Sequence, residues 1–253
     1  MSKSLVEGTI ISNEPISSDC YSMFISAADI ANAAVPGQFI NVYINDGSKL
    51  LPRPISICEI VDDKVRIVFR AVGGGTKELA TYKAGEVIRV MGPLGNGYPL
   101  EQDKSYMLIG GGIGIPPLLE LSKRLKGDIN IVLGYRDEIF LADEFNKYGK
   151  VYIASEDGNT GVKGNVIDAI NEYGISADII YSCGPTPMLR GLKAYGAEHN
   201  IKTYLSLEER MACGIGACLG CVTKSTDVDS HSHVNNKRVC KDGPVFEASE
   251  VDL

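Results

Sequence analysis

The chain has 253 residues, a hydrophobic content of 44% and a formal charge of −7. This length suits two domains with an appendage, and the composition is that of a folded globular protein. The acidic balance, without any run of lysine or arginine, argues against nucleic acid or an anionic membrane as a partner. Because the sequence lacks a secretory signal and any apolar run of about 18 residues, we expect a cytoplasmic protein with reduced thiols.

Residues 1–100 have the pattern of short β-strands. Segments 37–44, 64–72 and 86–95 are rich in β-branched and aromatic residues, and glycine, proline, aspartate and asparagine separate them. Several strands at this spacing predict a small antiparallel β-barrel. A short helix is expected at residues 76–83, directly after three consecutive glycines.

Two segments of this barrel contain candidate ligand-binding residues. Alone, "RPISI" (residues 53–57) is more typical of an edge strand with an exposed arginine than of a phosphate site. Downstream, however, "VFRAVGGGT" places Arg70 before Gly73–Gly75 and Thr76. Glycines that lead into a helix N-terminus favour anion binding, because unpaired N–H groups point at the ligand. Together the two segments predict a diphosphate ligand.

Residues 101–205 change to strands that alternate with helical periods. Strands are expected at 105–111, 128–136, 150–155, 177–183 and 202–208, and helices at 116–127, 166–174 and 186–199. This alternation predicts a doubly wound sheet of parallel strands, which is the usual frame of a nucleotide-binding domain.

Two turns of this second domain are candidate nucleotide sites. The run "GGGIGIPP" (residues 110–117) lies between a buried strand and a helix, the context in which glycine turns bind a pyrophosphate. A tight turn without a ligand is the alternative, since Ile115 stands where the third fingerprint glycine should be. Cys183, in "CGP", ends a later strand and could contact a nicotinamide, although single buried cysteines are more often inert.

Four of the seven cysteines lie in the last 41 residues: Cys213, Cys218, Cys221 and Cys240. The order C-x4-C-x2-C…C is that of plant-type [2Fe–2S] ligation. Glycines between them free the loop from Cβ clashes and let N–H groups approach the sulfurs. Structural zinc more often uses two C-x2-C pairs, and a redox dithiol needs only two cysteines. The spacing therefore favours an iron–sulfur cluster over zinc or unligated thiols.

Taken together, "RPIS", "GGT", "GPLGNGY" (residues 92–98), "GGGIGIPP", "CGP" and the cysteine tail resemble the ferredoxin reductase superfamily. The segments "LEERMACGIGACLGC" and "VCKDGPVF" resemble more specifically the family of electron-transfer subunits of type B dihydroorotate dehydrogenase. The resemblance covers essentially the whole chain. It implies an FAD-binding barrel at 1–100, an NAD-binding α/β domain at 101–205 and a [2Fe–2S] cluster domain at 206–253.

The resemblance also implies site residues. FAD would be bound by Arg53, Pro54, Ile55, Ser56, Val68, Phe69, Arg70, Gly75 and Thr76. NAD would be bound by Gly111, Gly112, Gly114, Cys183, Gly184 and Pro185, and the cluster by Cys213, Cys218, Cys221 and Cys240. Ile55 departs from the tyrosine that many relatives have before the flavin serine, which implies a different cover over the ring.

The implied function is to pass electrons from dihydroorotate oxidation, on the FMN of a catalytic partner subunit, through the cluster and FAD to NAD+. The expected assembly is a heterotetramer with two copies of each subunit, active in pyrimidine biosynthesis. We find neither a Ser/His/Asp set nor a convincing catalytic carboxylate pair, and we expect no catalytic side chain. Asp137 and Glu138, after the second strand of the nucleotide domain, would repel a 2′-phosphate and favour NAD, whereas Arg136 argues the reverse.

Two other functions remain open on sequence alone. A flavin and iron–sulfur reductase subunit of a hydrogenase, sulfide or ferredoxin-NADP complex would share these internal parts and differ in its partner. A zinc-stabilised binding module without redox activity would leave both nucleotide-type sites unexplained. An exposed residue beside the cysteines, such as Lys241, is a candidate for docking of the partner.

Overall fold

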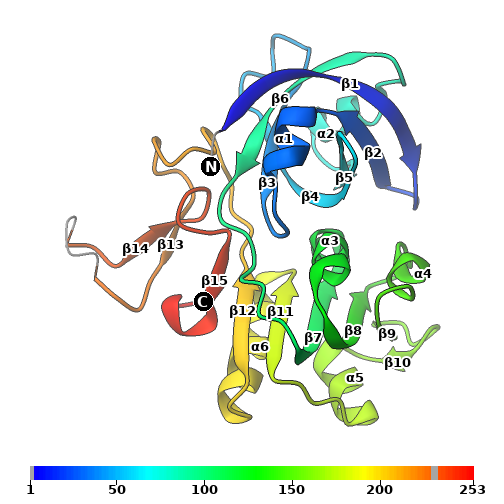
Figure 1. The fold of residues 1–253 in the computed structure, drawn as a ribbon, viewed down its shortest axis with the longest axis vertical. Coiled ribbons are helices and arrows are strands. Elements are labelled where there is room, and N and C mark those ends of the chain that lie inside the picture. Colours follow the sequence, from blue (N-terminus) through cyan, green and yellow to red (C-terminus); the bar gives the residue numbers. More distant parts are fainter. Residues whose placement is uncertain (1–2, 229–232) are drawn as a thin grey trace.

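The computed structural model describes residues 3–228 and 233–253. A barrel and a mixed sheet lie one above the other, and the C-terminal segment runs along one side of both (Figure 1). No helix of the described residues is long and apolar enough to cross a membrane.

The barrel is closed by six antiparallel strands in the order β1-β2-β5-β4-β3-β6. Inward side chains alternate along its strands, as in Val65, Ile67 and Phe69, and they form one apolar core. The elements are β1 (Ser4–Pro15), β2 (Cys20–Ser26), α1 (Ala28–Ala33), β3 (Phe39–Tyr43), β4 (Arg53–Val61), β5 (Lys64–Arg70), α2 (Gly74–Leu79) and β6 (Val87–Leu94).

The sheet has the strand order β10-β9-β8-β7-β11-β12-β15, parallel from β10 to β12. Leu118 and Leu121 of α3 pack on one face, and Ala169 of α5 and Leu192 of α6 pack on the other. The order reverses between β7 and β11, where ligands of such sheets bind. The elements are β7 (Lys104–Gly111), η1 (Gly112–Gly114), α3 (Pro117–Arg124), β8 (Gly127–Tyr135), α4 (Ala142–Phe145), β9 (Lys150–Ser155), β10 (Val162–Lys163), α5 (Val166–Tyr173), β11 (Ile179–Cys183), α6 (Thr186–Glu198) and β12 (Lys202–Ser206).

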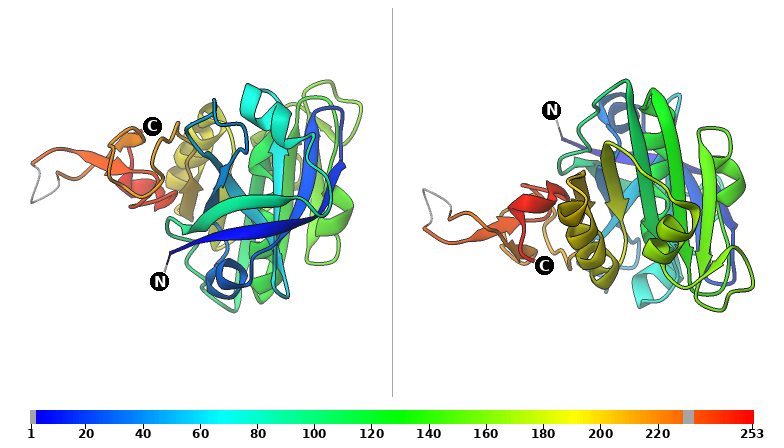
Figure 2. Two further views of the ribbon diagram at one scale, coloured as in Figure 1. Left: turned by 90° about the horizontal axis from the view of Figure 1, so that it is seen from above. Right: turned by 90° about the horizontal axis from the view of Figure 1, so that it is seen from below.

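The C-terminal segment forms a hairpin and then joins the sheet. The hairpin strands β13 (Val222–Lys224) and β14 (Asn236–Arg238) project away from both larger parts (Figure 2). Strand β15 (Val245–Glu247) then pairs antiparallel with β12, and the short η2 (Ala248–Glu250) follows. The cysteine segment is therefore anchored at its end to the α/β sheet.

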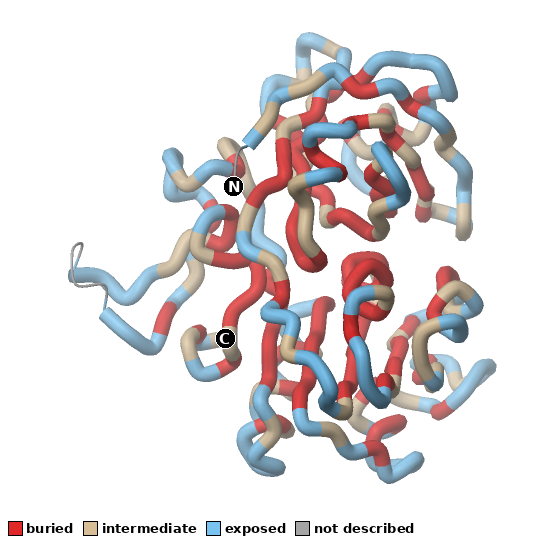
Figure 3. The backbone as a smooth tube through the Cα atoms, viewed as in Figure 1, coloured by how far each residue is buried: buried red, intermediate tan, exposed pale blue. Residues whose placement is uncertain are grey.

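Burial follows this division of the chain. The interiors of the barrel and sheet are buried, whereas much of the projecting hairpin is exposed (Figure 3). The predicted antiparallel barrel, parallel α/β sheet and separate cysteine segment are all confirmed. The place of β15 at the edge of the sheet was not predicted, because it depends on pairing with a strand about 40 residues earlier.

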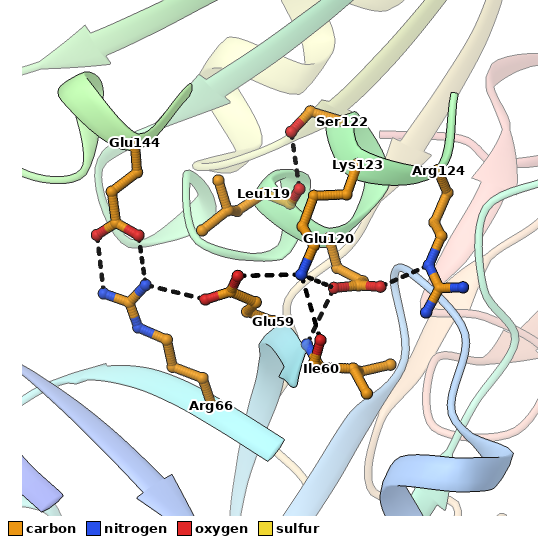
Figure 4. Close-up of polar contacts among 9 residues, drawn as sticks. All are labelled: Glu59, Ile60, Arg66, Leu119, Glu120, Ser122, Lys123, Arg124 and Glu144. Atoms are coloured by element: carbon orange, nitrogen blue, oxygen red, sulfur yellow. Dashed lines mark hydrogen bonds and ion pairs between the residues drawn. The ribbon is translucent and has the colours of Figure 1, made fainter. Parts of the chain in front are cut away.

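A buried carboxylate joins the barrel to the sheet domain. Glu120 of α3 has no exposed surface, and its carboxylate accepts a hydrogen bond from the backbone N–H of Ile60 in β4, at 2.9 Å. The same carboxylate pairs with Lys123 at 3.2 Å and Arg124 at 2.6 Å, one helical turn away (Figure 4). A buried charge is tolerated only when it is paired and hydrogen-bonded, and Glu120 meets both conditions.

A second group of charges extends this contact along the interface. Arg66 of β5 pairs with Glu144 of α4 at 2.5 Å and with Glu59 of β4 at 3.3 Å. Glu59 in turn pairs with Lys123 of α3 at 3.0 Å (Figure 4). Charges from two barrel strands thus alternate with charges from two helices of the sheet domain. This pattern gives the interface one preferred register.

We predict that Glu120→Ala destabilises the protein by about 2–3 kcal/mol, because it leaves the Ile60 N–H and two cations without their shared partner. The thermal midpoint should fall by about 4–9 °C in calorimetry. Glu172→Ala, at an exposed position of α5, is the control and should change stability by less than about 0.5 kcal/mol. Equal effects of the two substitutions would contradict the role given to Glu120.

Candidate functional site

Residues from all three parts of the chain line one cavity of about 290 Å³, which we call the barrel cavity. Strands β4 and β5 supply one wall, and Ile113 and Pro117 of the sheet domain supply another. Leu207, Met211 and Pro244 come from the segment that carries the cysteines. A ligand in this cavity would therefore touch the barrel, the nucleotide-type domain and the cysteine segment together.

Most of the residues predicted for FAD meet at this cavity. Seven of the nine line it: Pro54, Ile55, Ser56, Val68, Phe69, Arg70 and Thr76. The other two, Arg53 and Gly75, lie against each other. A Cβ on Gly75 would stand 2.2 Å from Nε of Arg53, so only glycine allows the guanidinium to lie there.

The contact between Arg53 and Gly75 fits a phosphate group. Nη1 of Arg53 donates to the carbonyl oxygens of Leu51 and Pro52, and the guanidinium lies over the first turn of α2. A guanidinium beside helical N–H groups is a chemically suitable partner for a phosphate. The hydroxyl of Thr76 is already bonded to the backbone of Gly73, so Thr76 shapes this turn in the structure described.

A second cavity of about 300 Å³, which we call the sheet cavity, lies where the strand order reverses. Three residues predicted for NAD line it: Gly111, Gly112 and Pro185. The other three pack against one another, because a Cβ on Gly114 would stand 2.4 Å from the carbonyl oxygen of Cys183 and 2.6 Å from Cα of Gly184. The glycine turn and the "CGP" turn therefore support each other from behind the cavity.

Cys183 is only 2% exposed and is absent from the residues that line either cavity. Burial raises the pKa of its thiol well above the ordinary range, so the neutral form is favoured. These observations favour the inert, packing role for Cys183 over a direct contact with a ligand.

Arg70 lines both cavities, and therefore connects them. Its Nε lies 3.1 Å from a carboxylate oxygen of Asp19, at the turn between β1 and β2. The two candidate ligand sites consequently share one positively charged side chain.

Of the two carboxylates predicted for NAD selectivity, Glu138 is directed at the barrel, whereas Asp137 pairs with Arg136, which itself lines the sheet cavity. Glu138 accepts a hydrogen bond from the backbone N–H of Ser18 in the barrel, at 2.7 Å, and Asp137 lies 3.4 Å from Arg136. Neither carboxylate is among the lining residues of the sheet cavity, whereas Glu156 is. Glu156 follows β9, and its N–H bonds to the carbonyl of Tyr135 at the end of β8. Glu156 was not predicted, because the carboxylates predicted for NAD selectivity follow the second strand of this domain and Glu156 follows the third.

A second missed residue is Glu208, which follows β12 and lines the barrel cavity. The residue is exposed overall, and its partial desolvation at the cavity wall raises the pKa of its carboxyl group. The signal available in the sequence was its place at the end of a strand, directly before the cysteine segment.

The four tail cysteines form two pairs. The backbone N–H of Cys218 donates to Sγ of Cys213, and the backbone N–H of Cys240 donates to Sγ of Cys221, at 3.4 Å each. Cys221 and Cys240 are buried, whereas Cys218 is exposed. Within residues 3–228 and 233–253, no three His, Cys, Asp or Glu side chains converge on a point that could hold a single metal ion.

Backbone N–H groups surround these sulfurs. Cys213 Sγ accepts from Ile215, Ala217 and Cys218 at 3.3–3.5 Å, and Cys240 Sγ accepts from Gly216 at 3.1 Å. Burial alone would raise the pKa of Cys213, but these N–H groups and the Cys218 thiol lower it to about 6. Burial and the neighbouring Cys221 raise the pKa of Cys240 to about 12. A ring of donors aimed at sulfur fits thiolates that ligate an iron–sulfur cluster.

Comparison with protein families and curated proteins gives a consistent result. The family model for the iron–sulfur cluster binding domain of dihydroorotate dehydrogenase B matches residues 208–252. A Bacillus cereus (strain B4264) protein named dihydroorotate dehydrogenase B (NAD(+)), electron transfer subunit, is 45% identical, with 96% of this chain and 97% of the relative covered. A Bacillus anthracis (strain CDC 684 / NRRL 3495) protein of the same name is 44% identical over the same shares.

Solved structures agree on the fold. The NADH-dependent reduced ferredoxin-NADP oxidoreductase structure superposes with a TM-score of 0.86 at 29% identity, covering 98% of this chain and 90% of that one. A ferredoxin reductase in carbazole 1,9a-dioxygenase superposes with a TM-score of 0.67 at 17% identity, covering 79% of this chain and 67% of that one. The second match is too distant in sequence to show more than the fold.

We predict that Gly75→Ala weakens FAD binding about 30-fold, because the new methyl group would displace the Arg53 guanidinium and remove roughly 2 kcal/mol of charge-assisted bonding. Titration of flavin-depleted protein with FAD, followed by flavin fluorescence, measures the effect. Gly47→Ala is the control, since no atom lies within 4 Å of its Cβ position. An unchanged affinity in a folded Gly75→Ala protein would contradict a phosphate role for this contact.

Proposed function

Because the chain belongs to the family of electron-transfer subunits of NAD-dependent dihydroorotate dehydrogenase B, we propose that it passes electrons from dihydroorotate oxidation to NAD+. The electrons come from the FMN of a partner catalytic subunit, cross a [2Fe–2S] cluster and FAD in this chain, and serve pyrimidine biosynthesis.

The barrel cavity is the observation that best supports this function. Its walls come from the barrel, the nucleotide-type domain and the cysteine segment, and Arg70 joins it to the sheet cavity. FAD, when bound, exchanges electrons with a nicotinamide in pairs and with an iron–sulfur cluster singly, so it belongs between the two. A ligand in the barrel cavity would lie between the nucleotide-type domain and the cysteine segment, which is the position that FAD needs.

The residues of the barrel cavity would bind and orient FAD. Arg53 and the turn at Gly75 would hold the phosphates, as their mutual contact allows. Four apolar residues would enclose the ring and exclude water: Pro54, Ile55, Val68 and Phe69. Ser56 would hold the ring by a hydrogen bond. No side chain of the chain is assigned a proton-transfer step, since the cofactors supply the redox chemistry.

The four tail cysteines would bind the cluster. Each iron of a [2Fe–2S] unit would take two thiolates, and the contacts within Cys213–Cys218 and within Cys221–Cys240 support one pair for each iron. The N–H groups directed at Cys213 and Cys240 would stabilise the thiolate form and affect the cluster's reduction potential.

The sheet cavity would bind NAD, with its pyrophosphate at the turn of Gly111 and Gly112. Glu156 would select against NADP, because its carboxylate would repel a 2′-phosphate and can accept a hydrogen bond from a ribose hydroxyl. We prefer Glu156 to Asp137 and Glu138, because neither of those two carboxylates lines the sheet cavity.

The cysteine loop is the proposed docking face for the catalytic partner. Ile215 and Leu219 are 42% and 61% exposed beside the cluster ligands, and the stem of Lys241 packs over Gly216. Exposed apolar residues at a redox centre suit an interface that must bring two centres close. A heterotetramer of two subunits of each kind, in the cytoplasm, completes the proposal.

The alternative function, as a subunit of another reductase complex, has less support from sequence identity. The NADH-dependent ferredoxin-NADP oxidoreductase matches at 29% identity, against 45% for the dihydroorotate dehydrogenase subunit from Bacillus cereus. The two functions differ in the partner, so an assay with that partner separates them.

We predict that the purified chain, mixed with the FMN-containing catalytic subunit, supports dihydroorotate-dependent formation of NADH, followed by absorbance at 340 nm.

Lys241→Ala should lower this activity about fivefold and leave NADH-to-dye activity intact, because it removes a charge at the docking face only. Lys147→Ala, at an exposed position after α4, is the matched control. Loss of both activities in Lys241→Ala would contradict the docking face, and no activity with the partner would contradict the proposed function.

We further predict that Glu156→Gln raises the ratio of kcat/KM for NADPH to that for NADH about tenfold, because removal of one like charge is worth roughly 1.4 kcal/mol. The effect should also appear as tighter binding of 2′,5′-ADP in calorimetry. Glu138→Gln is the control and should leave the ratio unchanged. If Glu138→Gln changes the ratio and Glu156→Gln does not, the assignment is wrong.

A further inference from the structure

Asn41 is a fully buried amide in the wall of the barrel. It lies at the centre of β3, where its neighbours along the strand, Ile40 and Val42, belong to the apolar core. Its ladder partners are Pro54 in β4 and Met91 in β6. A polar side chain is costly at such a place unless it bonds to a specific partner, so its contacts indicate what it does.

Within the described residues, the Asn41 side chain makes one hydrogen bond, and it goes to the cysteine segment. Nδ2 of Asn41 donates to the carbonyl oxygen of Cys213 at 3.1 Å, across 172 residues of sequence. Its Oδ1 is buried without a partner among the described residues. The buried amide thus leaves its own acceptor unsatisfied while it holds the backbone of the first cysteine.

Gly214 completes this contact from the other side. Its φ of +68° lies in the region that favours glycine, and a Cβ there would stand 2.4 Å from Nδ2 and 2.9 Å from Oδ1 of Asn41. The backbone at 213–214 therefore rests directly on the amide. A side chain at position 214 would therefore move the loop away from the barrel.

Asn41 also lies next to the barrel cavity. Its ladder partner Pro54 lines this cavity, as does Phe39, two residues earlier on the same strand. From the other direction, Met211 lines the cavity two residues before Cys213. The hydrogen bond from Asn41 to Cys213 thus fixes the distance between the cavity wall and the first sulfur of the loop.

We infer that Asn41 is a positioning residue for electron exchange between the barrel cavity and the cysteine loop. The inference rests on the proposed function, since it needs FAD in the cavity and a cluster on the loop. Electron exchange between two buried centres falls steeply with their separation, so a loop released from Asn41 would exchange electrons more slowly. Asn41 touches neither the proposed ring site nor a sulfur, so its effect is on placement.

Asn13 provides a matched control within the same barrel. Its Nδ2 also donates to backbone carbonyls, those of Leu79 and Tyr82 at 3.0 Å each, and its Oδ1 is also buried without a partner in the described part of the chain. These contacts lie within the barrel and do not involve the cysteine segment. A general loss of barrel packing should therefore appear when either asparagine is substituted. A change in the position of the cysteine loop should appear only when Asn41 is substituted.

The test compares Asn41→Leu with Asn13→Leu in the complete holoprotein. Flavin and iron contents, and the rate of flavin reduction by NADH, should match the unsubstituted protein in both variants. In stopped-flow absorbance, reduction of the cluster should be slowed about tenfold or more in Asn41→Leu alone. The midpoint potential of its cluster, from a titration monitored by electron paramagnetic resonance, should also shift. If Asn41→Leu does not fold, the same measurements are made on Asn41→Ala, whose side chain is smaller than that of asparagine.

Other outcomes overturn the inference. Equal cluster reduction rates in the Asn41 and Asn13 variants would show that the amide has only a packing role. Loss of iron with retention of flavin in the Asn41 variants would show that it serves to build the loop. If the unsubstituted protein itself binds no iron–sulfur cluster, the proposed function is wrong. This result can be distinguished from the two outcomes above, because they are seen only in the substituted proteins.

Discussion

The structure depends on one constraint, which is that a single cavity must be walled by three parts of the chain. The barrel cannot close this cavity alone, because Ile113, Pro117, Met211 and Pro244 come from outside it. The interface charges around Glu120 fix the sheet domain against the barrel, and β15 fixes the cysteine segment against the sheet. Asn41 then ties the cysteine loop back to the barrel. Each contact is a tertiary one that sets the position of a part relative to the cavity.

These contacts explain why buried polar groups lie where they do. Glu120 and Asn41 have no exposed surface, and each bonds to the backbone of a different part of the molecule. Apolar packing alone is non-directional and would allow the parts to slide. A buried hydrogen bond with one acceptable geometry removes that freedom. The chain therefore uses its buried polar residues to set positions, which suits a protein whose chemistry belongs to bound cofactors.

Local patterns in the sequence predicted the barrel, the parallel sheet and the candidate cysteine site, because strand periodicity, glycine turns and cysteine spacing are short-range signals. The features that sequence missed are long-range. Glu156 lines the sheet cavity because β9 ends beside β8, whereas Glu138 bonds to the barrel and Asp137 pairs with Arg136 without lining the cavity itself. Asn41 reads as an ordinary polar residue of a strand, and its partner lies 172 residues away. No local pattern contains such pairings.

The most direct test of the account is the visible absorption spectrum of the anaerobically purified protein before and after NADH is added. The account predicts overlapping flavin and iron–sulfur bands that both decrease with NADH, since the barrel cavity would connect the nicotinamide site to the cysteine loop. A colourless protein, or flavin bands without those of a cluster, would contradict the central claim that this cavity joins three redox centres.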